Sequence, residues 1–425
     1  MKHMIILFAL VTLFFGCTNQ TESVEIKSKS DSSGLTLMIY MAADNDLESY
    51  ALQNLNLMET ADYKGINVLV LIDRSEGYDE TDGNWTDTRL YKVRKDNAGN
   101  AQIVSERLDC PLLGLSTESS TELDMSNSSV LSNFINYVQR KFPSQNYALI
   151  IWGHGTGWRY ATDQTGGANK NRAVAIDDKT GSYMSIFNLG NVLRNQGLNI
   201  IGFDTCFGGV LENVYELKDC ADYTVACAGV SPSCGWDYKT LLEQISSEDF
   251  ESLQIAHAMA ASSPVNTTIF KNAKLEQLVN SFESFSKEIS RIILTETERK
   301  NTFDLLFNLK SYTYTQYPCD MYLDLAALSD GFIENDDENV RLAAKELKKK
   351  ISETVCLTNN QVCEIGVHFI PLVSFRTTAS VHSSDYIKNQ NKKDQCKFIK
   401  ESKWWVPTAE GRSGSVLDKL FYNGV

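Results

Sequence analysis

Two residues that can perform covalent catalysis each follow an apolar segment of the chain. His154 comes shortly after the apolar residues 149–152, and Cys206 comes shortly after the apolar residues 200–203. A thiol is a poor nucleophile until it loses its proton, so an enzyme with a cysteine nucleophile needs an imidazole close by as base and later as acid. The pair therefore predicts nucleophilic catalysis, with Cys206 as nucleophile and His154 as its partner.

Glycine-rich loops contain both residues. Of the five histidines, His154 lies in a loop with glycines at 153, 155 and 157. Such glycines let the backbone approach a substrate closely, and we expect the amides of Gly155 and Cys206 to form an oxyanion hole. An isolated histidine or cysteine is more often an ordinary buried or solvated side chain. The placement of both after predicted strands favours the catalytic interpretation.

Short apolar runs alternate with helical patterns over the first half of the chain. The runs lie at residues 35–41, 66–72, 147–152, 198–203 and 224–230. Between the first two, apolar residues recur at helical spacing after the capping-type pair Asp44 and Asn45. Uninterrupted apolar strands that alternate with amphipathic helices indicate an α/β fold, a mostly parallel sheet flanked by helices. Chemistry in such folds lies beyond the carboxyl ends of the strands, where His154 and Cys206 are both expected.

The domain organisation follows from length and from a change of pattern. A chain of 425 residues is expected to form more than one packed unit. We expect the α/β catalytic domain over residues 34–250. Beyond it, residues 251–425 carry two amphipathic helical stripes, at 275–292 and 340–355, and a strand at 364–372. This part is expected to be a mixed helical and β extension packed on the first domain.

The first residues of the chain have the pattern of a secretory leader. Lys2 precedes the apolar residues 4–15, and Gly16 and Cys17 end the leader in the manner of a bacterial lipobox. We expect residues 1–17 to be a signal peptide, Cys17 to carry a lipid, and the polar residues 18–33 to be a tether. The protein would then be exported and anchored in the membrane at the cell envelope or cell surface of a bacterium. Ordinary signal cleavage with Cys17 incidental is the alternative.

The composition argues against several classes of function. With 54 acidic against 40 basic residues, the net charge is −14, so nucleic acid is not expected as a partner. The sequence has no C-x-x-C, no H-E-x-x-H and no G-x-S-x-G, so redox, zinc peptidase and serine hydrolase chemistry lack their signals. No cofactor or metal is required by these motifs. The ten cysteines show no disulfide spacing, and their pairing stays open.

A set of longer motifs resembles one known family. They lie at residues 38–48, 73–74, 152–158, 203–206, 215–217 and 235–238. Together they are similar to the clostripain family of the caspase-like clan. The resemblance implies a caspase-like sheet, a cysteine endopeptidase that acts on proteins or peptides, and His154 and Cys206 as its dyad. It also allows a calcium requirement, which some relatives have.

The resemblance assigns a further role to Asp204. It implies that this carboxylate lies at the base of the pocket that selects Arg or Lys before the cleaved bond. A carboxylate shielded from water prefers a cationic side chain over a neutral one. The alternative is that Asp204 caps the next helix or orients its loop. Some relatives carry a second acid before the Gly-Trp motif, where this chain has Cys234.

Self-cleavage is expected between the two dyad residues. Residues 163–182 are rich in Gly, Asn and Asp and contain Lys170 and Arg172, as an exposed loop would. A peptidase that selects basic residues could cut there, and relatives are activated by cleavage in the corresponding loop. An ordinary surface loop is the alternative. At the level of the whole protein, the alternative is a surface binding or adhesin lipoprotein that keeps a peptidase scaffold without turnover.

Overall fold

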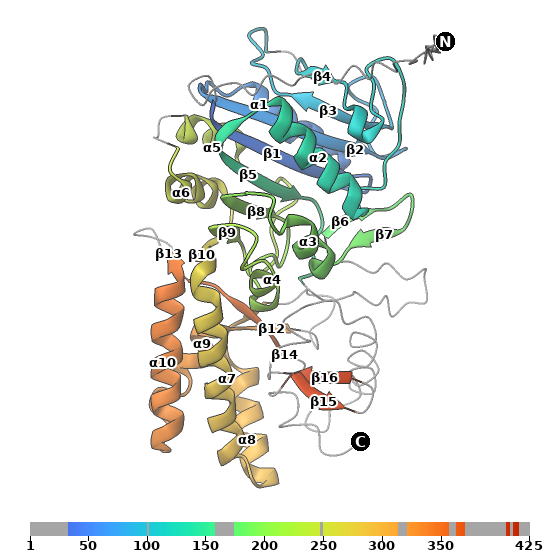
Figure 1. The fold of residues 1–425 in the computed structure, drawn as a ribbon. Coiled ribbons are helices and arrows are strands. Elements are labelled where there is room, and N and C mark those ends of the chain that lie inside the picture. Colours follow the sequence, from blue (N-terminus) through green and yellow to red (C-terminus); the bar gives the residue numbers. More distant parts are fainter. Residues whose placement is uncertain are drawn as a thin grey trace, which may run out of the picture. The chain divides into compact units, whose positions relative to one another are not determined.

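Nine strands form one mixed sheet in the described part of the chain. The structure is a computed structural model, and it describes residues 33–99, 102–157, 174–246, 250–312, 321–356, 363–369, 405–408 and 411–415. The strand order is β13-β10-β9-β8-β5-β1-β2-β3-β4 (Figure 1). The strands are β1 (Ser33–Ala43), β2 (Ile66–Arg74), β3 (Thr88–Lys92), β4 (Glu106–Leu108), β5 (Ser144–Trp152), β8 (Ile200–Asp204), β9 (Tyr223–Ala226), β10 (Thr268–Lys271) and β13 (Val355–Cys356). The five central strands from β9 to β2 run parallel, and the strands outside them pair antiparallel. The expected mostly parallel α/β sheet is confirmed.

Helices pack on both faces of this sheet. The helices α1 (Glu48–Glu59), α5 (Tyr238–Ile245) and α6 (Ser252–Ser262) share a core with Leu37, Ile39 and Met41 of β1. The alternate residues Met38 and Tyr40 pack on the other face, with α2 (Ser128–Lys141) and α3 (Ile186–Leu193). Side chains alternate between the two faces of a strand, so β1 is apolar throughout because both of its faces are buried.

The sheet does not end at the boundary predicted near residue 250. Both β10 and β13 come after that residue and extend the sheet beyond β9. Residues 33–425 group as one compact unit by their contacts. The change of sequence pattern near residue 250 reflects added helices rather than a break in the sheet.

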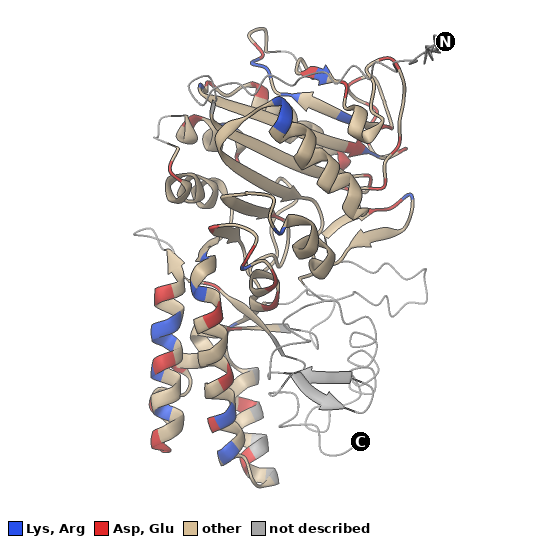
Figure 2. Cartoon of the chain, viewed as in Figure 1, with Lys and Arg blue, Asp and Glu red and all other residues tan. Residues whose placement is uncertain are grey.

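The two predicted helical stripes are found as α7 (Leu275–Ile292) and α10 (Glu338–Thr354). Their apolar sides meet in a core that includes Phe282, Ile289 and Leu347. Figure 2 shows charged residues of both signs along these two helices. The same region contains the helices α4 (Leu211–Glu216), α8 (Glu296–Phe307) and α9 (Leu325–Asp330).

Smaller elements complete the described part. A hairpin is formed by β6 (Val174–Asp177) and β7 (Ser182–Met184). A second sheet has three strands, β11 (Ser311–Tyr312), β12 (Met321–Asp324) and β14 (Gly366–Phe369). Two further strands, β15 (Trp405–Thr408) and β16 (Gly411–Ser415), pair with each other. The strand expected at 364–372 is found as β14. Short 3₁₀ helices lie at Pro111–Leu113 and Asn272–Lys274. Within the described residues, we find no helix with the length and apolar character needed to cross a membrane.

Candidate active site

The loops that carry His154 and Cys206 leave the sheet side by side. Strands β5 and β8 are parallel neighbours, and Trp152 is in register with Asp204, so His154 and Cys206 each lie two positions beyond a paired residue. The loops also touch, since a Cβ atom built on Gly155 would lie only 2.3 Å from the carbonyl oxygen of Cys206. The predicted meeting of the two loops at one sheet edge is therefore found, while their catalytic roles stay predictions.

His154 has a carboxylate partner that the sequence reasoning missed. The Nε2 atom of His154 lies 2.6 Å from Oδ1 of Asp46. A carboxylate only accepts hydrogen bonds, so in this pair Nε2 carries the proton and Nδ1 of a neutral ring remains the acceptor. The sequence did not point to Asp46, because the contact depends on β1 being the parallel neighbour of β5. The side chain of Asp46 is 67% exposed, so this hydrogen bond lies near the surface, and a role for Asp46 in orienting the ring of His154 is a prediction.

A buried amide fixes the loop that carries Asp46. The Nδ2 atom of Asn45 donates to the carbonyls of Ala42, at 3.0 Å, and Ile176, at 3.1 Å, and its Oδ1 accepts from the amide of Leu47 at 3.0 Å. The sequence assigned Asn45 to a helix cap, but α1 begins at Glu48 with Leu47 at its N-cap and no side-chain cap. Asn45 instead ties the end of β1 to β6.

The sulfur of Cys206 receives a backbone hydrogen bond. The amide of Ser231, in the loop after β9, donates to Sγ of Cys206 at 3.3 Å. A donor of this kind interacts more strongly with a negatively charged sulfur than with a neutral one. The next residue, Phe207, has φ of +55°, and its amide donates to the carbonyl of Gly229 at 2.8 Å. A positive φ is uncommon for an aromatic residue, so the turn after Cys206 is held by its surroundings.

Other cysteines in the described part have less reactive surroundings. Burial raises the pKa of the Cys110 thiol to about 11 and the pKa values of Cys220, Cys227 and Cys363 to about 12. A thiol with so high a pKa is almost fully protonated at neutral pH and is a poor nucleophile. These surroundings favour Cys206 as the nucleophile over Cys110, Cys220, Cys227 and Cys363.

Asp204 lies beneath the Gly-Trp-Asp-Tyr motif. Its Oδ2 atom accepts from the amide of Trp236 and from the hydroxyl of Tyr238, both at 3.0 Å. Burial raises the pKa of Asp204 to about 7, although these two hydrogen bonds act in the opposite direction. A Cβ atom on Gly235 would lie 2.7 Å from Oδ2 of Asp204, and Gly235 has φ of +68°. The hydrogen bonds from Trp236 and Tyr238 fit the alternative for Asp204, in which its carboxylate orients a loop. A role for Asp204 in a substrate pocket stays a prediction.

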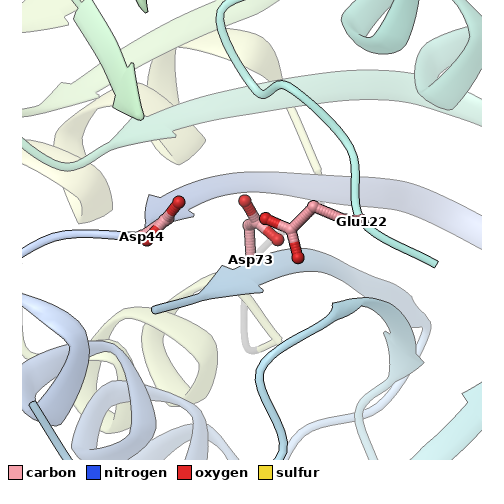
Figure 3. A group of neighbouring side chains, drawn as sticks. All are labelled: Asp44, Asp73 and Glu122. Atoms are coloured by element: carbon pink, nitrogen blue, oxygen red, sulfur yellow. The ribbon is translucent and has the colours of Figure 1, made fainter. Parts of the chain in front are cut away.

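Three acidic residues beside this site form a group that could hold a metal ion. Asp44, Asp73 and Glu122 each offer a carboxylate oxygen, and these atoms lie within 4.8 Å of one another (Figure 3). Asp44 follows β1 and Asp73 belongs to β2, so both lie at the same edge of the sheet as His154. No metal ligand was predicted here from the sequence.

Three of the predicted site residues lie outside the described residues. These are Cys17, Lys170 and Arg172. The described chain stops at Gly157, shortly after His154, and resumes at Val174 with β6. The expected cleavage segment therefore connects the loop of the candidate base to the hairpin of β6 and β7.

The chain is similar to known proteins in sequence and in fold. The model of the clostripain family matches residues 39–405. Clostripain of Hathewaya histolytica is 29% identical over 249 residues, which is 53% of this chain and 45% of clostripain, so the match spans less than half of that relative.

Solved structures share the fold. An inactive zymogen C11 protease from Parabacteroides distasonis gives a TM-score of 0.59 at 18% identity, over 87% of this chain and 99% of that one. A secreted C11 cysteine protease from Bacteroides thetaiotaomicron, in complex with an irreversible peptide inhibitor, gives 0.57 at 17% identity with the same coverage of the two chains.

Proposed function

Because this chain belongs to the clostripain family, we propose that it is a cysteine endopeptidase with Cys206 as nucleophile and His154 as general base and acid. The observation that supports this most directly is the contact between the two loops beyond β5 and β8, with the amide of Ser231 on the sulfur of Cys206. A cysteine nucleophile beside a histidine base can hydrolyse an amide, and a carboxylate on the far side of the base can orient it.

The reaction proceeds in two covalent steps. The proton of Cys206 moves to Nδ1 of His154, the thiolate attacks the carbonyl carbon of the scissile bond, and the carbonyl oxygen becomes an oxyanion. The amides of Gly155 and Cys206 donate to that oxygen. The proton on His154 then moves to the leaving amine, which departs and leaves a thioester on Cys206. Water, deprotonated by His154, hydrolyses the thioester and restores the thiol.

For specificity, Asp204 selects Arg or Lys before the cleaved bond. Asp204 is 5% exposed, is in register with Trp152, and directly precedes the turn to Cys206. A cationic substrate group that reaches it would find a carboxylate shielded from water, where a charged hydrogen bond is strong. A neutral substrate group would leave that carboxylate unpaired.

The enzyme activates itself by cutting after Lys170 or Arg172. The segment that contains them joins the candidate base to β6, so a cut there leaves the β5 and β8 strands of the sheet intact. N-terminal sequencing of the purified wild type beside Cys206→Ala tests this. New termini at Asn171 or Ala173 in the wild type alone are expected, and a fully active uncut wild type would refute the need for cleavage.

The protein is exported and held at the cell envelope by a lipid on Cys17. Residues 1–17 supply the leader pattern, and residues 18–33 supply a polar tether before β1 begins at Ser33. Metabolic labelling with a fatty acid tests the anchor. Label is expected on the wild type and not on Cys17→Ala, and an unlabelled wild type would indicate simple secretion.

A fluorogenic peptide panel tests the proposed activity. The protein without residues 1–33 is offered peptides that differ only before the cleaved bond: Arg, Lys, Leu and Asp. Cleavage of the Arg and Lys peptides is expected, with none by Cys206→Ala or His154→Ala. Equal cleavage of all four would refute the specificity. Binding without turnover by the wild type would favour the adhesin alternative.

A further inference from the structure

The acidic group of Figure 3 gathers residues that are far apart in the sequence. Asp44 follows β1, Asp73 lies near the end of β2, and Glu122 lies in the segment before α2. Their carboxylate oxygens come within 4.8 Å of one another. Asp177, at the end of β6, is close enough that its charge raises the pKa of Asp73, after the larger effect of burial. Ionised carboxylates gathered at this distance repel one another, and either protons or a bound cation can relieve that repulsion.

Buried carboxylate oxygens in this group lack hydrogen-bond partners. Asp44 is 1% exposed and Asp73 is 0% exposed, yet Oδ1 of Asp44 and Oδ2 of Asp73 have no partner among the described residues. The other oxygen of each is bonded, since Thr88 Oγ1 donates to Asp73 at 2.6 Å and the amide of Lys179 donates to Asp44 at 3.3 Å. Buried polar atoms are almost always paired, so two unpaired acidic oxygens in one group call for a ligand.

The nearby lysine does not meet this need. Nζ of Lys179 lies 3.2 Å from Oε2 of Glu122, and the Lys179 side chain is 59% exposed. The lysine therefore pairs with the outer member of the group. The inner oxygens of Asp44 and Asp73 remain without a donor.

We propose that Asp44, Asp73 and Glu122 bind one hard divalent cation of the calcium type, with Asp177 beside them. The ligand atoms are carboxylate oxygens, without the histidine or thiolate that zinc and softer metals prefer. Calcium accepts six to eight oxygen ligands in irregular geometry, so water can complete a site with three carboxylates. The family resemblance allows a calcium requirement in general terms; the residues of this chain give the ion a position.

The ion would join segments that meet at the candidate base. The amide of Asp178 donates to the carbonyl of Asp44 at 2.9 Å, so the hairpin of β6 and β7 already rests on the end of β1. Two residues after Asp44, Asp46 contacts His154. A cation on Asp44 and Asp73 would therefore fix the loop that orients the base and the hairpin that follows residues 158–173. Its binding does not depend on the proposed peptidase activity.

The test measures binding directly. The full chain carrying Cys206→Ala, which cannot digest itself, is stripped with a chelator and titrated calorimetrically with CaCl₂, MgCl₂ or ZnCl₂. We expect one calcium per chain with a Kd below about 1 mM, and a rise in Tm of about 3 °C or more at saturating calcium. Asp73→Asn should weaken calcium binding at least 100-fold and abolish the rise in Tm. Asp336→Asn, which changes an exposed acid elsewhere, should bind as the parent does.

The metal-free Tm separates a lost site from a damaged fold. Asp73→Asn keeps the shape of the side chain and removes a buried negative charge, so its metal-free Tm should equal or exceed that of the parent. If this variant fails to fold, Glu122→Gln at the outer position supplies the same comparison. The proposal is overturned if the parent shows neither binding heat nor a change in Tm at about 5 mM calcium. It is also overturned if Asp73→Asn binds calcium as the parent does, or if zinc binds far more tightly than calcium.

Discussion

Oδ1 of Asp46 lies 2.6 Å from Nε2 of His154, although 108 positions separate the two residues in the chain. The contact exists because β1 and β5 are parallel neighbours, with Met41 in register with Trp152, so the loops beyond both strands emerge together. Asn45 holds the first of these loops against β6. The carboxylate of Asp46, in the loop beyond β1, therefore lies where it can set the orientation of the His154 imidazole.

Replacing that carboxylate should slow turnover and leave substrate binding nearly intact. For Asp46→Ala we expect kcat to fall by about 10- to 100-fold, because the ring of His154 loses its orientation and tautomer. KM should stay within about twofold, since Asp46 acts through His154 rather than on the substrate. Steady-state kinetics on an Arg peptide measure both, with Asp336→Asn as control. Partial rescue by Asp46→Glu is expected; an unchanged kcat in Asp46→Ala would show that Asp46 plays no part.

The preference for a basic residue should depend on pH through Asp204. The pKa of Asp204 is raised to about 7 by burial, so the carboxyl is mostly protonated below pH 7 and mostly ionised above it. The kcat/KM ratio for an Arg peptide over its citrulline analogue should therefore rise as pH increases through about 7. Taking a ratio cancels the titration of the dyad. Asp204→Asn should give a low ratio that does not change with pH, and a pH-dependent ratio in that variant would locate the acid elsewhere.

The same residue should make stability fall with rising pH. An unfolded Asp has a pKa of about 3.9. Between that value and about 7 the folded state keeps a proton that the unfolded state has lost, so the free energy of unfolding decreases with pH. The total decrease is on the order of 4 kcal/mol and is complete above pH 7.

Urea unfolding measures this effect as a difference between two proteins. In the Cys206→Ala background, Asp204→Asn should match its parent near pH 4 and exceed it near pH 8. The comparison subtracts the titration of all other groups. A variant less stable than its parent at pH 8 would mean that the charged form of Asp204 is the favoured one in the fold.

Adding a methyl group to Gly155 should disable the site. Its Cβ atom would lie 2.3 Å from the carbonyl oxygen of Cys206 and 2.8 Å from Oγ1 of Thr205, so the two loops must move apart. A displacement of about 1 Å at a reacting centre costs about 100-fold, and we expect Gly155→Ala to lose at least that in kcat/KM. Gly331→Ala is the control for the general cost of replacing glycine, because its φ of −62° suits any residue and its added carbon would meet its nearest atoms at 3.4 Å or more. Circular dichroism should show both variants folded.

A buried ion pair near the same sheet edge should matter for stability. Nε of Arg74 lies 2.5 Å from Oε1 of Glu48, and both side chains are 0% exposed. The Arg74 guanidinium also lies 4.6 Å from the ring centroid of Trp85. In Glu48→Ala the buried Arg74 still donates to the carbonyls of Asp79 and Thr81 but loses the carboxylate that balances its charge, so the free energy of unfolding should fall by about 3–5 kcal/mol. The double variant with Arg74→Met should be less destabilised than the single one; a larger loss would show that Arg74 contributes mainly through other contacts.

The central strands could be predicted because they are apolar on both faces. The run at residues 35–41 reads as a strand by itself, and β1 is found there. The residues of β10, Thr268–Lys271, are few and mixed in character, and they form a strand only because β9 lies beside them. Short edge strands of this kind depend on tertiary pairing, which local pattern does not contain. The extension of the sheet by β10 and β13, beyond residue 250, could not be predicted for that reason.

The residues of the candidate site also differ in how far the sequence alone could identify them. His154 and Cys206 were identifiable because each is flanked by glycines after an apolar run. Asp46, Asp73 and Glu122 lie among ordinary acidic residues in the sequence, and only the strand order brings them to their partners. A prediction of strand order would have been needed to find them.

Residues 158–173 lie between His154 and Cys206 in the chain, and this position has a consequence for engineering. A chain divided within that segment would become two polypeptides that meet inside a sheet, through the register from Ala148 with Ile200 to Trp152 with Asp204 (Figure 1). One polypeptide would hold the base and the other the nucleophile, so neither could act alone. Supplied by two separate genes, the pieces would constitute a split enzyme. At low concentration its activity would grow with the product of the two concentrations, and fusing each piece to one of two binding partners would convert their association into a catalytic signal.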